Sequence, residues 1–259
     1  MSEYSARLPI ASFSFTQSED SVIKAAEAEI VSRCMERFGF EYIEPAPVPS
    51  FEGDGSDDRR YGIMNLKLAE KYGYHAAPGV PIPRDSLQKD AASVLFGSLE
   101  PYPTGKIVTE YHGTKVPKGG CRGEAFQQVE APFEPGDDAS AAYEISVRSF
   151  TESMHKTRVV KVFRAWSSCM ERYGYTYKMP LDPLNDRDFL GEAEANSVEI
   201  QTAVADVKCK NSTNLPAVWF AAESDIQRAK IANSESRLSR LRVNHAKELE
   251  NARRIITNG

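Results

Sequence analysis

The spacing of apolar residues along the chain is typical of amphipathic α-helices. Apolar side chains recur every three to four residues through much of the sequence, and this period places them on one face of a helix. Segments rich in Pro and Gly separate these runs, and proline lacks the N–H that regular structure needs. The pattern predicts a mainly α fold, a helical domain with long Pro/Gly-rich loops and at most minor strand content. The predicted helices cover residues 21–38, 59–72, 85–96, 119–129, 139–173 and 191–210.

A further helix is predicted near the C-terminal end. Asn214-Leu215-Pro216 has the composition of a helix start, and no Pro or Gly follows before Gly259. We therefore predict one long helix over about 216–256, which at roughly 60 Å would reach beyond a small domain. This helix either packs on its own domain or docks on a partner or a second copy, and the sequence leaves both open. The candidate interaction surface is an apolar seam formed by Leu238, Leu241, His245 and Leu249.

An internal repeat relates the two parts of the chain. Residues 34–42 read CMERFGFEY and residues 169–177 read CMERYGYTY, and a shorter echo, KYGY, occurs at 71–74. Gly39 and Gly174 lie where a helix would stop in the left-handed conformation that glycine adopts at little cost. A repeated helix C-cap therefore explains most of the similarity, and a paired aromatic binding site is the alternative.

The composition limits the class of protein. The chain has 259 residues, a net charge of −5 and 12 Phe, 11 Tyr and 2 Trp, which is too aromatic for a disordered chain. An acidic chain lacks the basic face that a nucleic-acid partner requires. No apolar run approaches the roughly 20 residues of a membrane-spanning helix. We expect two related halves, 18–135 and 136–259, within one compact domain.

Four cysteines constrain the fold and the compartment. They occur without a C-x-x-C pair or a neighbouring His, which disfavours structural zinc and leaves disulfides or buried free thiols. Disulfides are favoured, and they would indicate an oxidising compartment. Each predicted half contains a cysteine near the end of its first long helix and another on a later helix. We therefore expect two disulfides, Cys34–Cys121 and Cys169–Cys209, each within one copy of the repeat.

No recognised catalytic, cofactor or metal motif is present, so we predict no catalytic residue, no cofactor and no metal. The acidic segment 52–58 lacks the alternating ligands of a calcium loop and is interpreted as a solvated loop. An enzyme with an unrecognised site is the alternative, and it would use His75, His112 or Glu124 in the loop-rich first half.

Several motifs together resemble a known family. They are the two repeated segments, Arg59-Arg60-Tyr61-Gly62, Tyr72-Gly73-Tyr74-His75, the Gly119–Ala125 segment and Ala205-Asp206-Val207-Lys208-Cys209. Over about residues 20 to 255 the chain is similar to a family of actinobacterial secreted proteins, most of them predicted lipoproteins of unknown function. Members carry a leader and a lipid-attachment cysteine, neither of which occurs in this sequence. The resemblance implies a trimmed chain that meets the membrane through a removed lipid anchor.

The resemblance also implies a function class. Some family members are encoded beside ABC exporters, including in antibiotic-peptide clusters. We therefore expect a non-enzymatic, extracytoplasmic cell-envelope protein, an accessory or binding component linked to an ABC exporter or to resistance against an antimicrobial compound. The expected partner is an envelope or exporter protein, and no nucleic acid is expected. The alternatives are an enzyme and a cytosolic helical scaffold, and the scaffold would keep its cysteines reduced.

Overall fold

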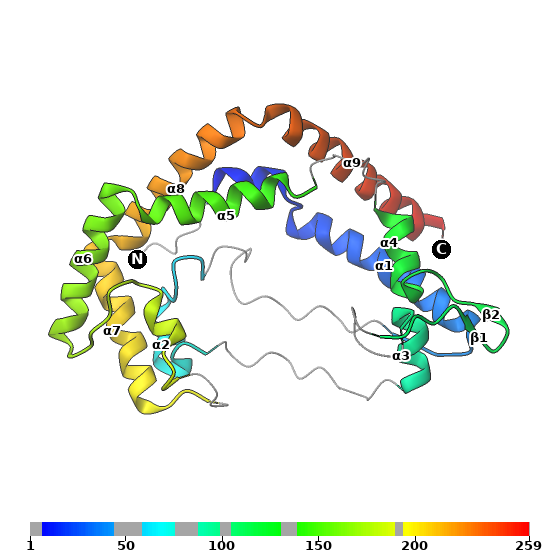
Figure 1. The fold of residues 1–259 in the computed structure, drawn as a ribbon, viewed down its shortest axis with the longest axis horizontal. Helices are drawn as coiled ribbons and strands as arrows, with labels where there is room; N and C mark the ends of the chain where they lie inside the picture. Colours follow the sequence, from blue (N-terminus) through cyan, green and yellow to red (C-terminus); the bar gives the residue numbers. More distant parts are fainter. Residues whose placement is uncertain are drawn as a thin grey trace. The chain divides into compact units, whose positions relative to one another are not determined.

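A computed structural model describes residues 7–43, 59–75, 88–98, 105–130, 139–189 and 194–258. Within these ranges the chain forms nine α-helices, two short 3₁₀ helices and one two-stranded antiparallel hairpin (Figure 1). The hairpin pairs only four residues, with Glu110 opposite Lys115 and Tyr111 opposite Thr114. The prediction of a mainly α fold is confirmed.

The helices gather into two compact units, and each unit is assembled from three separate stretches of the chain. Unit 1 draws its described residues from 1–12, 48–80 and 142–234, and unit 2 from 13–47, 81–141 and 235–259. The predicted consecutive halves, 18–135 and 136–259, therefore do not coincide with the units. The reason is packing between helices that lie far apart in the sequence: α1 packs with both α4 and α9, and α2 packs with α7.

Unit 1 is built around two buried tryptophans. Trp166 and Trp219 are fully buried, and the Trp219 ring contacts the rings of Tyr61, Phe150 and Phe163. Helix α6 carries the Trp166 face and packs against α7 and α8. The elements of this unit are η1 (Pro9–Phe13), α2 (Leu66–Tyr72), α5 (Ala141–Met154), α6 (Thr157–Arg172), η2 (Asp182–Asn185), α7 (Ser197–Thr213) and α8 (Leu215–Ala232).

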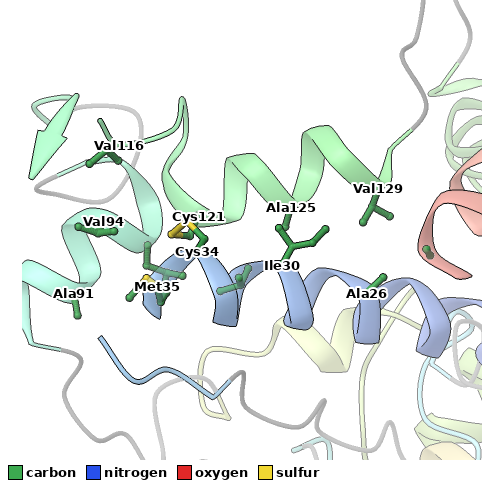
Figure 2. Packing of buried hydrophobic residues seen from close by; sticks show 13 residues of the cluster. Ala26, Ile30, Cys34, Met35, Ala91, Val94, Val116, Cys121, Ala125 and Val129 are labelled. Atoms are coloured by element: carbon green, nitrogen blue, oxygen red, sulfur yellow. A yellow bond between two sulfur atoms is a disulfide. The ribbon is translucent and has the colours of Figure 1, made fainter. Parts of the chain in front are cut away.

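The buried core cluster of unit 2 consists of aliphatic side chains, Met35 and the two bonded cysteines Cys34 and Cys121, with aromatic residues packed at its edge. Figure 2 shows Ala26, Ile30 and Cys34 on one helix facing Ala125 and Cys121 on another, with Cys34 and Cys121 joined by a disulfide. A capping box between Thr16 and Glu19 satisfies the backbone N–H groups at the start of the helix over Gln17–Arg37. The elements of this unit are α1 (Gln17–Arg37), α3 (Lys89–Phe96), β1 (Glu110–Tyr111), β2 (Thr114–Lys115), α4 (Gly120–Val129) and α9 (Glu235–Asn258).

The predicted helix over 216–256 is wrong as a single element. α8 ends at Ala232 and α9 begins at Glu235, so a turn separates them, and the Ser234 N–H donates to the Ile231 carbonyl at 3.0 Å. The side chains of Asn233 and Ser234 can hydrogen-bond to nearby backbone groups and so weaken a helix. Because neither residue is Pro or Gly, the sequence did not predict the break. A long C-terminal helix of 24 residues is nevertheless present in α9.

Other predicted boundaries also shift. The predicted helix 139–173 is divided between α5 and α6, and the Lys156 N–H there donates to the Ser153 carbonyl at 3.0 Å. The predicted helix 59–72 begins only at Leu66, because a turn containing Gly62 at φ 82° precedes it. Parts of the predicted helices 85–96 and 191–210, and the acidic segment 52–58, lie outside the described residues.

The apolar seam of α9 is buried, which corrects its interpretation as a docking surface. Leu238, Leu241 and Leu249 are at most 9% exposed. The half-buried His245 ring lies 4.2 Å from the ring of Phe15, between ring centroids. α9 packs against α1 within unit 2, so the period of the seam reflects core packing.

Candidate functional site

Both repeated segments end a helix in the same way. In unit 2 the Phe40 N–H donates to the Met35 carbonyl at 3.1 Å, and in unit 1 the Tyr175 N–H donates to the Met170 carbonyl at 3.1 Å. The glycine before each aromatic residue has a positive φ, 80° at Gly39 and 88° at Gly174. This is the Schellman motif, so the interpretation of the repeat as a helix C-cap is confirmed.

The shorter repeat at 71–74 does not form this motif. Gly73 has φ 57°, and its N–H donates to the Ala69 carbonyl at 3.1 Å, without the second Schellman bond. A Cβ atom at this position would lie 2.7 Å from Oε1 of Glu199 on α7. Glycine is needed here because the backbone passes directly over a buried carboxylate.

The structure pairs Cys34 with Cys121 and Cys169 with Cys209, the two pairs expected from the repeat. The Cα–Cα separations are 5.5 Å and 5.6 Å, within the usual range for disulfides. Each bridge lies within one unit and joins two of its helices. Two disulfides indicate an oxidising environment outside the cytoplasm.

The aromatic residues that follow the two caps have different neighbours. In unit 2 the Tyr111 ring of the hairpin lies against both Phe38 and Phe40, with ring centroids 6.4 Å and 5.4 Å away. In unit 1 the residue equivalent to Phe40 is Tyr175, and it lines a cavity together with Tyr177. The aromatic residue after the glycine is therefore covered by a protein side chain in unit 2, at Phe40, and borders a cavity in unit 1, at Tyr175.

The cavity has a volume of about 360 Å³ and lies in unit 1. Its walls are the segment between α6 and α7 and the first turns of α7. The side chains that give it chemical character are Tyr175, Tyr177, Asp186, Asp188, Phe189 and Thr202. None of the described lining residues is Lys or Arg, so the lining carries negative charge without an internal cation.

Hydrogen bonds fix the acidic side of this cavity. The Tyr177 hydroxyl donates to Oδ2 of Asp186 at 2.6 Å, and the Asp188 N–H donates to Oδ1 of Asp186 at 3.1 Å. Burial raises the pKa of Tyr177, and the hydrogen bond to Asp186 and the charges of Asp186 and Asp188 raise it further. Tyr177 is therefore a neutral donor at physiological pH. The Asp188 carboxylate makes no hydrogen bond or ion pair with any described residue.

Local turns hold the walls in place. Asp182 Oδ2 accepts from the N–H groups of Lys178 and Met179 at 3.0 Å and 2.7 Å, and the Ser167 hydroxyl donates to the Tyr177 carbonyl at 2.6 Å. Asn196 caps α7 by accepting from the first-turn N–H groups. The Cys169–Cys209 disulfide joins α6 to α7, the helices before and after the segment that lines the cavity.

One turn beyond the lining residue Thr202, α7 contributes Asp206 to a buried ionic cluster, the Asp206 cluster, formed by Asp206, Lys210, Trp166 and Tyr74. Asp206 accepts from Lys210 Nζ at 2.8 Å, Trp166 Nε1 at 2.9 Å and the Tyr74 hydroxyl at 3.3 Å. Burial raises the pKa of Asp206, and the positive charge of Lys210 opposes this effect. The Tyr74 ring stacks on the cavity residue Phe189, with ring centroids 5.9 Å apart, so the cluster contacts the cavity lining.

The candidate catalytic residues of the first half are not brought together in the cavity. His75 Nδ1 lies 2.8 Å from Oε1 of Glu199, which also accepts from the Tyr74 N–H at 2.7 Å. In unit 2, His112 stacks on Tyr111 at 4.3 Å, and Glu124 forms an ion pair on the surface of α4 with an arginine of α1. None of the three lines the described cavity.

The Arg59–Gly62 motif has a structural role. Arg59 donates to the carbonyls of Tyr74 and His75, both at 2.8 Å. Arg60 and Tyr61 donate to the buried carboxylate of Glu223 on α8, with Arg60 Nε at 3.0 Å and the Tyr61 hydroxyl at 2.8 Å. The motif therefore fastens this turn of the first half to helices of the second half.

Sequence reasoning missed the acidic and aromatic lining of the cavity. Asp186 and Asp188 stand in a short Pro-containing segment with no helical period, and only their position between two cysteine-bearing helices marks them. Sequence reasoning also missed Glu223 and Gln227, which lie four residues apart on a helix and are both fully buried. Their spacing on the inner face of α8 is the signal that could have identified them.

Together the fold and the site define a disulfide-bonded helical protein with one aromatic and acidic cavity described in unit 1. No protein-family model matches the chain, and no curated protein or solved structure shows significant similarity to it. Among the described residues, no helix combines the length and the apolar character needed to cross a bilayer.

Proposed function

We propose that the protein is a non-enzymatic, extracytoplasmic protein of the cell envelope and that it binds a small ligand in the cavity of unit 1. One observation carries the proposal. The cavity is bordered by α7 and by the segment between α6 and α7, and the Cys169–Cys209 disulfide links these two helices. The disulfide restrains the two helices next to the cavity, and a preorganised site lowers the entropic cost of binding.

The state of the titratable groups supports binding rather than catalysis. The Asp206 carboxylate is engaged by three donors, and Glu223 by the side chains of Arg60, Tyr61 and Gln227. Within the described cavity, Tyr177 is held as a neutral donor to Asp186. Groups arranged in this way position one another and do not form a nucleophile–base pair.

The finer part of the proposal rests on the family resemblance. It places the protein at the cell surface, secreted or lipid-anchored, as an accessory or binding component linked to an ABC exporter or to resistance against an antimicrobial compound. The two disulfides support the extracytoplasmic part of this proposal.

The test is carried out in cells of the native host. Free thiols are blocked before lysis, and the protein is mapped by non-reducing peptide analysis. Protease is added to intact cells in parallel, with a cytosolic protein as the control. We expect both disulfides to be present and the protein to be cleaved from outside. Four alkylated thiols in a protein protected from protease would overturn the proposal.

The exporter link has its own test. Cross-linking of intact cells should capture the protein on an exporter component or its envelope partner, identified by peptide sequence. Deletion of the exporter genes should abolish that cross-link but leave the protein at the cell surface. A cross-link pattern that deletion does not change would contradict this part of the proposal.

A further inference from the structure

We infer that the cavity of unit 1 is a site for a small organic cation, a protonated amine that carries an apolar or aromatic body. This inference rests on the proposed function in one respect, namely that the cavity binds a ligand, and it names the chemical class of that ligand.

The charge of the lining points to a cation. Asp186 and Asp188 border the cavity, and none of the described lining residues is Lys or Arg. The Tyr177 hydroxyl donates to Oδ2 of Asp186 and the Asp188 N–H donates to Oδ1 of Asp186, so the two acidic residues lie at the same end of the site. Asp188 is exposed and makes no ion pair or hydrogen bond with a described residue, so its carboxylate is available to an ammonium group.

The aromatic residues point to the same class. Tyr175, Tyr177 and Phe189 contribute three rings to one cavity. A cation is attracted to the face of an aromatic ring, and this attraction adds to that of a neighbouring carboxylate. The buried ring of Phe189 gives the cavity an apolar interior, whereas Asp186 is half-buried and Asp188 is exposed. The ligand body therefore lies inside and the ammonium group lies at the rim.

Unit 2 shows what fits against the same aromatic segment. There the ring of Tyr111 packs on Phe40, the residue equivalent to Tyr175. The protein thus uses a planar ring to cover one copy of the motif. A volume of about 360 Å³ lies at the lower end of ligand sites, which span roughly 300–1,000 Å³. A one-ring amine matches both the shape and the size.

The test uses three matched probes with the full, disulfide-bonded chain. They are phenethylammonium, the uncharged 2-phenylethanol and the anionic phenylacetate, and binding is followed by NMR chemical shifts and calorimetry. A fragment of this size should bind with about millimolar affinity. We expect the cation to bind about tenfold more tightly than the alcohol and the anion to bind least. Equal binding of the three probes, or no binding of the cation, would overturn the inference.

Two pairs of variants assign the site. Asp188→Asn should weaken binding of the cation about fivefold and leave the alcohol unchanged, whereas Asp20→Asn, the same change on α1 of unit 2, should affect neither. Tyr175→Leu should weaken both probes and Tyr175→Phe should retain binding of both, while Tyr173→Leu serves as the control because Tyr173 is 51% exposed and lies outside the cavity lining. Thermal melts check that each variant is folded.

The outcomes separate the inference from the proposed function. If Asp188→Asn binds the cation as the parent protein does, the ligand class is wrong and the envelope location is unaffected. If the cation binds as expected but the cysteines are reduced in cells, the proposed location is wrong and the cavity chemistry stands.

Discussion

The two copies of the repeated segment end their helices in the same way and carry a disulfide each, but their aromatic residues have different neighbours. At both caps the bonding distances agree closely, with the glycine N–H at 2.9 Å and 3.0 Å from its acceptor. In unit 2 the hairpin residue Tyr111 packs on the aromatic pair, whereas in unit 1 the equivalent segment borders a cavity with two carboxylates. The cap is thus a local structure fixed by a few residues, and its function depends on the elements packed around it.

The interiors of the two units differ in a related way. The described core of unit 2 consists of small aliphatic side chains, Met35 and one disulfide. Unit 1 buries Asp206, Lys210 and Glu223 completely, and each has hydrogen-bond partners. Buried ionic clusters add little net stability but fix one arrangement, since other arrangements would leave charges unpaired. The unit with the cavity is the unit whose packing is specified in this way.

The largest expected effect comes from the disulfides. Replacing Cys169 and Cys209 with Ala should lower the free energy of unfolding by about 4 kcal/mol, because the bridge closes a loop of 40 residues, and replacing Cys34 and Cys121 should cost about as much. Ligand binding distinguishes the units: the first variant should lose binding of phenethylammonium at a temperature where it is still folded, and the second should retain it. Equal binding by the two variants would contradict the role of the unit 1 bridge in holding the cavity. Denaturant unfolding and calorimetry make the comparison.

The second effect tests the ionic interior of unit 1. Lys210→Met leaves Asp206 buried without its cation, so we expect a loss of about 3 kcal/mol in the free energy of unfolding. The control is Lys24→Met in unit 2, where the lysine pairs with Asp20 on the surface of α1 and is 51% exposed. The control should cost less than about 0.5 kcal/mol, since exposed pairs of this kind contribute little. A similar cost for both variants in denaturant unfolding would show that the buried pair contributes no more than a surface pair.

The third effect tests whether the two caps are equivalent. Gly39→Ala and Gly174→Ala should each cost about 1 kcal/mol, because alanine is strained at a positive φ while no atom lies within 4 Å of the added methyl group. Gly73→Ala should cost more, since its Cβ would meet Glu199 at 2.7 Å. Thermal melts of the three variants give the order, and a larger loss at Gly39 or Gly174 than at Gly73 would contradict it.

Sequence reasoning was successful where the information is local. Helix type and the two caps follow from short-range patterns, namely the period of apolar residues and the glycine at each C′ position. The cysteine pairs, 87 and 40 residues apart, were predicted from the internal repeat. The division into units could not be predicted, because α2 packs on α7 and α9 on α1 across most of the chain. The cavity could not be predicted either, since Tyr175 looks the same in sequence as its packed equivalent Phe40, and Tyr111 distinguishes them only in three dimensions.

The smallest effect concerns a carboxylate of unit 2 and sharpens the contrast with the paired charges of unit 1. Burial, followed by the charges of Glu248 and Glu27, raises the pKa of Glu130 to about 7 from an ordinary value of 4.5. The folded state therefore binds more protons than the unfolded state between about pH 4.5 and 7, so the free energy of unfolding falls as the pH rises through this window.

Glu130→Gln removes this ionisation. Above pH 7 the variant should melt higher than the parent protein, and well below pH 4.5 the two should melt together, because Glu130 is then protonated in both the folded and the unfolded state. Glu130 is partly exposed and solvent screens its charge, so the gain at pH 8 should be below about 1 kcal/mol, or a few degrees at most in Tm. Glu41→Gln, which changes an exposed carboxylate in the same unit, is the control and should leave the pH profile unchanged. A variant that is less stable than the parent at pH 8 would show that Glu130 is stabilised as an anion, and unit 2 would then resemble unit 1 in pairing its buried charge.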